Sequence, residues 1–273
     1  MSSLRIRVRE SRLDLPSVPG ALPGGLVVEV PADPIKDDRG TVVFPWPPQG
    51  ERRLILKVYG RMGMLNWLRK QVVGYRACRE FRTLAMLRAA SVECCEPLLW
   101  GTGRSRERGL FEVLATREIR GTVTLAERAP SLAPSERTEL VGQVFEQLAR
   151  MHRAGVYHGA PYLTNVLVSS GRETPRGIAL LDLEKSVRFP RDIRGSRMAS
   201  FDLVNLVNST LTRMSRGNAR AALARYGLDD AAVERVFAAV RAYRSSKFQR
   251  YRRRAELLAR GVLSRAWRRR RGI

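Results

Sequence analysis

Two short stretches carry the polar residues of this chain whose types and spacing could do chemistry. Residues 156–168 run Val-Tyr-His-Gly-Ala-Pro-Tyr-Leu-Thr-Asn-Val-Leu-Val, and residues 180–185 run Leu-Leu-Asp-Leu-Glu-Lys. The pattern predicts a tight turn at His158-Gly159, a short loop, a strand after Asn165 and a second strand that ends near Asp182. Amide and carboxylate oxygens suit a hard cation such as Mg²⁺. Placed in a loop and at the end of a neighbouring strand, these groups could converge on a phosphate and its metal.

The roles of two charged residues earlier in the chain depend on the strand and the helix that carry them. Lys57 lies inside an apolar strand predicted over residues 53–59, and Glu80 lies among arginines in a helix predicted over residues 75–90. Taken alone, the lysine is explained by a side chain that reaches solvent from a sheet edge. The glutamate is likewise explained by an exposed helix charge. The alternative is a phosphate-binding lysine that faces a cleft, with Glu80 as its partner.

The chain before residue 120 is predicted to be mostly sheet. Residues 1–25 are basic and then rich in proline and glycine, which is typical of an arm with little structure of its own. The first three predicted strands follow one another with turn residues between them, which favours an antiparallel meander. The strands are expected at 26–30, 41–44, 53–59, 92–101 and 109–119, and helices at 63–73 and 75–90.

After residue 120 the pattern becomes mainly helical. Ser135 is the expected N-cap of a long helix that Gly155 ends. Further helices are expected at 124–128, 201–214, 219–226 and 229–244. The last segment, residues 241–273, has 13 Lys or Arg residues and one acid, Glu256. It indicates a basic amphipathic helix that lies on an anionic membrane or grips nucleic acid, unless it is simply a solvated helix packed on the last lobe.

The overall charge restricts the class of partner. Fifty Lys and Arg against 26 Asp and Glu give a net charge of +24 over 273 residues. Such a field favours nucleic acid, anionic lipid or phosphorylated glycolipid. There is no apolar run long enough to span a bilayer and no apolar signal core at the N-terminus, so the expected location is cytoplasmic. Three cysteines, two of them adjacent, make a poor disulfide framework and fit a reducing compartment.

The order of these elements over residues 26–215 resembles the protein kinase-like fold. That resemblance implies an α+β protein with a small five-stranded N-terminal lobe with a helix, and a mainly helical C-terminal lobe. Within this fold the chain most resembles the lipopolysaccharide core kinases, that is, the Kdo/heptose kinases and their InaA-like relatives. The motifs that carry the resemblance lie at residues 56–59, 78–90, 96–101, 148–156, 158–168 and 181–184.

The resemblance divides the chain into four parts. Residues 1–25 would be the basic arm, residues 26–119 the N-terminal lobe and residues 120–240 the C-terminal lobe. The basic tail would then be residues 241–273.

The resemblance also implies roles for individual residues. Lys57 would contact the α- and β-phosphates of ATP, with Glu80 holding it as an ion pair. Asn165 and Asp182 would hold Mg²⁺. Phosphoryl transfer depends mostly on positioning and charge neutralisation, so such residues would supply most of the stabilisation. The segment near Glu118 would be the hinge between the two lobes, and its backbone groups would contact adenine.

The family's catalytic loop has the pattern His-x-Asp-x-x-x-x-Asn, and this chain departs from it. His158, which would be a buried support, and Asn165 match, but Ala160 stands where the Asp would accept the substrate's proton. A positioned base typically contributes about 10²- to 10⁴-fold in rate. Residues 37–40, Asp-Asp-Arg-Gly, also make a poor glycine-rich loop.

Three hypotheses follow from these observations. The first is a kinase, peripheral on the inner membrane, that phosphorylates a sugar of the lipopolysaccharide core, with a lipid A glycolipid as partner. The second is a pseudokinase that binds nucleotide or partners without efficient transfer. The third is a nucleic-acid-binding protein, which charge alone favours and which the absence of a recognition motif in the sequence disfavours.

Overall fold

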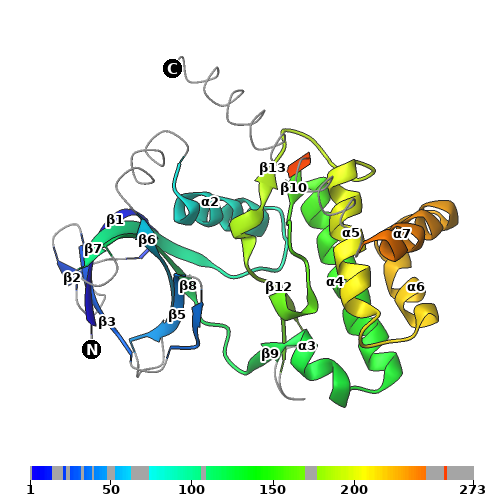
Figure 1. The fold of residues 1–273 in the computed structure, drawn as a ribbon, viewed down its shortest axis with the longest axis horizontal. Coiled ribbons are helices and arrows are strands. Elements are labelled where there is room, and N and C mark those ends of the chain that lie inside the picture. The colour runs from blue at the N-terminus through cyan, green and yellow to red at the C-terminus, as the bar shows by residue number, and fades with distance from the viewer. Residues whose placement is uncertain are drawn as a thin grey trace. The chain divides into compact units, whose positions relative to one another are not determined.

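The computed structural model describes residues 2–13, 21–22, 25–31, 34–38, 40–47, 53–62, 74–105, 109–169, 177–243 and 255–256. The chain divides into two compact units. Unit 1 comprises Met1–Met86 and Cys95–Arg120, and unit 2 comprises Leu87–Cys94 and Gly121–Ile273. Each unit is described separately below (Figure 1).

The described residues of unit 1 form an antiparallel sheet and helix α2. The strand order is β2-β3-β1-β7-β8-β6-β5-β4, and Figure 1 shows the sheet strongly curled. Helix α2, Arg76–Ala89, carries the buried side chains Ala77, Phe81, Leu84 and Leu87 at helical spacing. The strands are β1 Ser2–Ser11, β2 Ala21–Leu22, β3 Gly25–Val30, β4 Lys36–Asp38, β5 Thr41–Trp46, β6 Leu54–Met62, β7 Pro97–Ser105 and β8 Gly109–Arg117.

Alternation along the strands separates a buried core from the face that carries Lys57. In β6 the residues Leu54, Leu56 and Val58 point into an apolar cluster, so Lys57 and Tyr59 point to the opposite face. The same cluster holds buried side chains from β1, β3, β5, β7 and β8. Strands from both ends of the sheet order thus share one core, as the curl of the sheet requires.

Two predictions for this part of the chain are wrong. Residues Ser2–Ser11 are not an unstructured arm but a ten-residue strand between β3 and β7. The predicted meander holds only for β5 and β6, because β3 pairs with β1 and β2 and is separated from β5. The sheet therefore has eight strands instead of five, with the five predicted ones among them. Strand β7 also begins at Pro97, later than expected.

Unit 2 is mainly helical and holds two small sheets. Helix α4 packs against α6, and α5 packs against α7. The α-helices are α3 Leu125–Arg128, α4 Pro134–Arg153, α5 Arg197–Thr210, α6 Arg216–Ala224 and α7 Asp230–Ala242. One sheet has the order β12-β11-β9 and the other pairs β10 with β13. Their strands are β9 Thr122–Thr124, β10 Val156–Tyr157, β11 Val166–Ser169, β12 Ile178–Leu180 and β13 Val187–Arg188.

Most helices of unit 2 begin where a side chain caps them. Ser196, Ser215 and Asp229 each accept a backbone N–H at the start of α5, α6 and α7. The prediction that Ser135 caps α4 is wrong. The helix begins one residue earlier at Pro134, which lacks an N–H and so fits the first helical position.

Two predicted segments lie largely outside the described residues. The helix predicted over residues 63–73 belongs to them entirely, and the basic tail is described only at residues 241–243 and at Ala255 and Glu256. Ala255 packs against a buried apolar cluster that includes Tyr157 and Phe201. Glu256 accepts a hydrogen bond from the Tyr157 hydroxyl at 2.5 Å. Among the described residues, no helix is long and apolar enough to cross a membrane.

Candidate functional site

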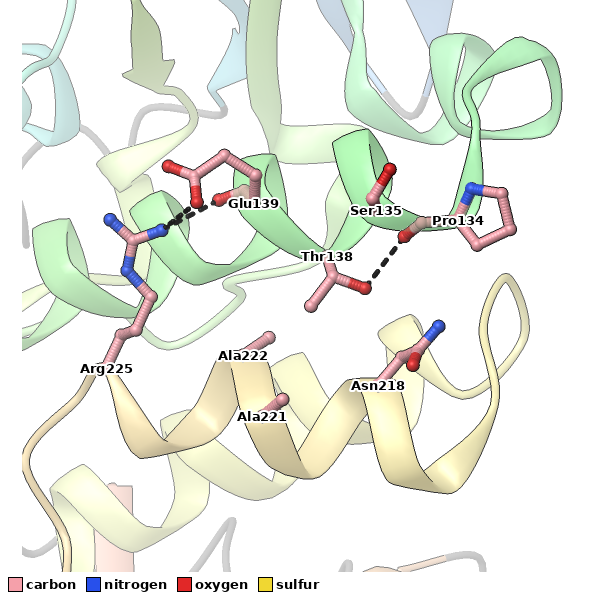
Figure 2. A pocket seen from close by; sticks show the side chains of 8 residues that line it. All are labelled: Pro134, Ser135, Thr138, Glu139, Asn218, Ala221, Ala222 and Arg225. Atoms are coloured by element: carbon pink, nitrogen blue, oxygen red, sulfur yellow. Dashed lines mark hydrogen bonds and ion pairs between the residues drawn. The ribbon is translucent and has the colours of Figure 1, made fainter.

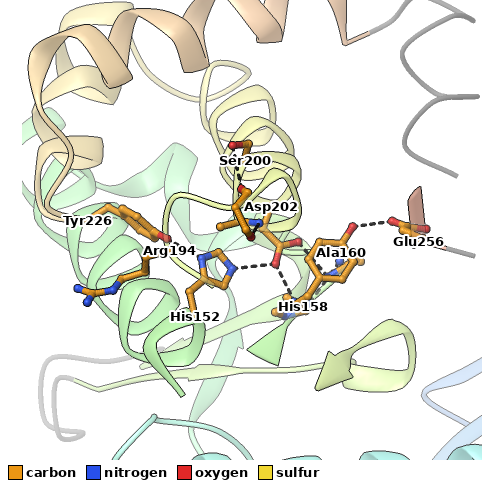
Figure 3. Close-up of polar contacts among 12 residues, drawn as sticks. His152, His158, Ala160, Arg194, Ser200, Asp202, Tyr226 and Glu256 are labelled. Carbon is orange, nitrogen blue, oxygen red and sulfur yellow. Dashed lines mark hydrogen bonds and ion pairs between the residues drawn. The ribbon is translucent and has the colours of Figure 1, made fainter. Parts of the chain in front are cut away.

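The loop that follows β10 is anchored from below by one buried carboxylate. Asp202 on α5 is fully buried and accepts the backbone N–H of His158 at 2.7 Å and that of Gly159 at 2.9 Å (Figure 3). Gly159 has φ of +86°, a conformation that suits glycine. A Cβ there would also lie 2.9 Å from the Lys185 side chain. Asp202 and Gly159 together fix the path of the loop.

A buried histidine and a tyrosine hold this carboxylate in place. His152, the last buried residue of α4, lies with Nε2 3.0 Å from Asp202 Oδ2 and Nδ1 2.7 Å from the Tyr226 hydroxyl. Burial raises the pKa of Tyr226 above its ordinary value, so its hydroxyl stays protonated. The sequence suggested only a packing or surface role for His152. Its partners are distant in the chain, so no local pattern reveals them.

His158 is a fully buried support of the same loop, as the resemblance implied. Its Nδ1 accepts the Ala160 N–H at 3.3 Å, and within the described residues its Nε2 has no hydrogen-bond partner. Burial lowers the pKa of His158, against the opposing effect of the Asp202 and Asp182 charges. The neutral ring therefore serves to shape the loop.

Asn165 and Asp182 lie at adjacent ends of paired strands. β11 and β12 pair Val166 with Leu180, and the Leu181 N–H donates to the Asn165 carbonyl at 2.9 Å. This register places the residues after β12 beside the residue before β11. Both side chains are partly exposed. An amide and a carboxylate thus lie at one edge of the small sheet.

Asp182 has an unusual backbone conformation. Its φ of +60° and ψ of +58° are left-handed, which is uncommon for residues other than glycine and tolerated best by Asp and Asn. The residue follows β12 and precedes a short 3₁₀ turn, Leu183–Lys185. Strained backbone of this kind concentrates at functional sites, which supports a role for the carboxylate.

Ala160 lies in the loop between His158 and Asn165. Its methyl group is 2% exposed, and its carbonyl accepts the Asn165 side-chain N–H at 2.9 Å. The loop thus keeps the hydrogen bond that orients Asn165. The carboxylate that would accept a proton is replaced by a buried methyl group.

In unit 1, Lys57 and Glu80 form an ion pair. Lys57 Nζ lies 3.5 Å from both Glu80 carboxylate oxygens, as the resemblance implied, and the side chains are 17% and 4% exposed. The Tyr59 hydroxyl also donates to Glu80. Tyr59 lies two residues from Lys57 on the same strand face, and Lys57 Nζ lies 5.2 Å from its ring centroid. The lysine is therefore held in one place and keeps some exposure.

The helix that carries Glu80 is fixed at its N-terminus by another buried carboxylate. Glu112 on β8 is fully buried and accepts the Ala77 N–H at 2.8 Å. Ala77 belongs to the first turn of α2, where N–H groups lack partners within the helix. Glu112 lies opposite Tyr59 in the register of β6 and β8. Sequence analysis missed both residues, although Tyr59 shares the strand face of Lys57 by simple alternation.

Glu118, in the expected hinge, is occupied by contacts within unit 1. Its carboxylate lies 2.9 Å from Arg53 and 3.3 Å from Arg120, and its N–H donates to the Arg53 carbonyl. That N–H already has an acceptor. Contact of this segment with adenine remains a prediction.

A hollow in unit 2 lies between α4 and α6. It measures about 440 Å³, and Figure 2 shows Ser135, Thr138 and Asn218 along it. Its one cation, Arg225, is paired with Glu139 at 2.7 Å and with Glu146 at 2.6 Å. With the charge of Arg225 already neutralised, the hollow offers little attraction for an anion. No group of three or more His, Cys, Asp or Glu in the described parts of the chain could hold a metal.

An ion-paired lysine beside a sheet-bound helix, and an Asn and Asp at the edge of a loop anchored by a buried carboxylate, define the class of kinase-like phosphotransferase folds. A solved structure described as "WaaP in complex with acyl carrier protein" has this fold. It matches with a TM-score of 0.57 and 17% identity over 84% of this chain and 89% of that one. The chain belongs to the lipopolysaccharide kinase (Kdo/WaaP) family, whose model matches residues 38–247. No curated protein sequence matches it.

Proposed function

We propose that this protein uses ATP and Mg²⁺ to phosphorylate a sugar of the lipopolysaccharide inner core at the cytosolic face of the inner membrane. Membership of the lipopolysaccharide kinase family supports a kinase of this substrate class. The observation that carries the proposal furthest is the placement of Asn165 and Asp182 at the same edge of the small sheet. Both side chains have the oxygens that Mg²⁺ prefers.

The residues present fit a magnesium nucleotide. Asn165 and the strained Asp182 would hold the metal, which leaves most of its ligands to water and phosphate, as is usual for Mg²⁺. Lys57, kept in place by Glu80 and Tyr59, would bind phosphate oxygens. When bound, the magnesium nucleotide supplies the phosphoryl group and the charge that stabilises its transfer.

The first experiment measures binding and transfer together. Titration with Mg·ATP should give saturable binding, and radiolabelled ATP should label purified core glycolipid. Asp182→Asn should abolish the magnesium-dependent part of binding and lower labelling by at least about 10²-fold, since a metal ligand is lost. Asn tolerates the left-handed backbone as Asp does, so this variant should unfold at the temperature of the natural protein. Labelling that survives the substitution would contradict the proposed role of Asp182.

A second candidate function is nucleotide binding without efficient transfer. The buried methyl of Ala160 favours it, because the loop is otherwise intact while the proton acceptor is missing. The matched variants Ala160→Asp and Ala160→Asn have similar size, but only the first adds a base. A gain of about 10²-fold or more in labelling with Asp alone would show that the base is the missing part. Equal labelling by the natural protein and Ala160→Asp would show that transfer does not need a base here.

The partners we propose are the core glycolipid and the anionic surface that contains it. The net charge of +24 favours both. The acyl carrier protein of the solved WaaP complex is a further candidate partner. Affinity capture with a purified acyl carrier protein tests that possibility separately from kinase activity.

A further inference from the structure

Strand β1 carries a row of exposed arginines on the face of the sheet opposite its core. Leu4 and Ile6 are buried in the core of unit 1, so the alternate residues Arg5, Arg7 and Arg9 face outward and are exposed. Alternate residues of a strand lie about 6.8 Å apart. Arg5 and Arg7 follow the regular register with β7, and Arg9 lies at a register shift between Val8 and Glu10. The three arginines thus form a row of cations along one strand.

The neighbouring strand widens this row. The register of β1 and β7 places Arg104 directly opposite Arg5 and Thr102 opposite Arg7, on the same face. Arg104 is also exposed. We call Arg5, Arg7, Arg9 and Arg104 the arginine face. Figure 1 shows β1 and β7 side by side in the curled sheet.

Contacts within the protein do not account for this arrangement. In the described parts of the chain the side chains of Arg5, Arg7 and Arg104 make no hydrogen bond or ion pair, and Arg9 makes only a 3.4 Å contact with Thr102. Like charges directly opposite each other destabilise a strand pair. The arginine face therefore lowers the stability of unit 1 unless an anion is present.

The acids nearby do not neutralise the face. Glu29 on β3 is exposed and lies opposite Ser3, beyond the row. Glu10 at the end of β1 is engaged by Arg82 at 3.5 Å and by the Trp100 indole at 3.1 Å. Glu112 on β8 lies opposite Thr102, but it is fully buried and accepts the Ala77 N–H. Within the described residues, four cations therefore stand against one unengaged carboxylate at the margin.

Close packing of the backbone fixes the position of the row. Gly101 and Gly103 on β7 face the β1 backbone, and a Cβ at Gly103 would lie 2.2 Å from the Arg5 carbonyl oxygen. Any side chain there would force β1 away. Strand β1 also precedes the residues matched by the family model, which begin at residue 38.

We propose that the arginine face docks on the phosphate groups of an anionic lipid bilayer, an inference that rests on the proposed function in placing the acceptor at a membrane. A guanidinium binds phosphate oxygens in a bidentate manner and is weakly hydrated. A bilayer presents phosphates at every lateral spacing, so a row of cations can bind them without a fixed spacing between the phosphates. Single-stranded nucleic acid would need aromatic platforms for its bases, and the arginine face has none.

The test is sedimentation of the full chain with vesicles, in the absence of nucleotide and acceptor. One set of vesicles is pure phosphatidylcholine, and the other contains about one third phosphatidylglycerol. Binding should require the anionic lipid and should weaken with salt. Replacing all four arginines of the face with glutamine should lower partitioning by roughly 100-fold or more, at about fivefold per cation.

The control removes the same charge elsewhere. Arg150, Arg153, Arg191 and Arg235 are exposed in unit 2 and lie outside the basic tail, and their replacement with glutamine should lower partitioning less than tenfold. Equal losses in the two quadruple variants would overturn the proposal, since net charge alone would then explain binding. It would also be overturned if the arginine-face variant still sediments, or if the face is needed to capture an acidic protein or nucleic acid but not vesicles.

Failure of the docking proposal can be distinguished from failure of the proposed kinase function. Mg·ATP binding by the arginine-face variant should be unchanged, because none of the four residues belongs to the candidate site. A protein that binds vesicles through this face but labels no glycolipid would contradict the kinase proposal alone. A protein that labels detergent-dispersed glycolipid but ignores anionic vesicles would contradict the docking proposal alone.

Discussion

At the scale of single residues, Asp202 determines the shape of the candidate site without taking part in it. It is fully buried and accepts hydrogen bonds from two successive loop N–H groups, those of His158 and Gly159. A buried carboxylate is stable only when such donors compensate for lost hydration. Its contact with His152 adds a third partner. The loop therefore keeps its form although the residue that would do the proton chemistry is replaced by Ala160.

The buried His158 predicts a dependence of stability on pH. Its pKa is lowered in the folded protein, mainly by burial, whereas the unfolded chain has the ordinary value near 6.5. Below about pH 6.5 the unfolded state binds more protons, so the stabilisation is complete above that pH and is lost as the pH falls. Between about pH 6.5 and pH 5.5 the free energy of unfolding should drop by up to ~1 kcal/mol from this residue. Urea titrations at the two pH values measure the drop.

The control for that prediction is His158→Gln, which cannot titrate. Its free energy of unfolding should be lower than that of the natural protein at pH 7, since the buried contact with the Ala160 N–H is altered. Over the same pH interval the variant should lose less stability than the natural protein. Identical pH slopes in the two proteins would show that His158 is not the titrating group.

At the scale of elements, helix α2 is positioned by the buried carboxylate of Glu112. This carboxylate accepts the Ala77 N–H in the first turn, where the helix dipole also favours a negative charge. Glu80 lies one turn further along the same helix, so this contact helps to fix the position of Glu80 relative to Lys57. Glu112→Ala should lower the free energy of unfolding of unit 1 by about 2 to 3 kcal/mol. The Ala77 amide should also lose protection from hydrogen exchange.

A matched acid in the same sheet provides the control for Glu112. Glu29 on β3 is exposed, and Glu29→Ala should change the free energy of unfolding by less than about 0.5 kcal/mol. Glu112→Gln should fall between the two, because its amide oxygen still accepts the N–H but without a charge. A Glu112→Ala variant as stable as Glu29→Ala would mean that α2 is held by its apolar face alone.

The elements also show what the sequence could predict. The apolar residues in 53–59 correctly predicted β6, and alternation along that strand in the structure places Lys57 on the face opposite the core. The same alternation is present in β1, but arginines on every second position resembled a charged arm, and the strand was missed. Pairing of β1 with β7 joins residues almost a hundred positions apart, and such a contact leaves no local signal.

The residues of the candidate site also divide into those that the sequence could predict and those that it could not. Asn165 and Asp182 could be chosen as candidates from motif order, because each lies at a fixed place relative to a strand. Tyr226 and Glu112 could not, because each acts through a neighbour brought near only by tertiary folding. Sequence patterns therefore point to candidate residues inside motifs more readily than to the distant residues that support them.

At the scale of the whole molecule, the net charge of +24 has a consequence for stability. Like charges repel in the compact state, and screening by salt relieves that repulsion. The arginines of the arginine face, which form no ion pair within the described residues, add to it locally. The free energy of unfolding should therefore rise by about 1 kcal/mol when sodium chloride increases from about 0.02 to 0.3 M. The arginine-face glutamine variant should show a smaller rise, and a neutral osmolyte should stabilise both proteins equally. A fall in stability with salt would instead mean that the surface ion pairs, such as Arg220 with Glu234, outweigh the repulsion.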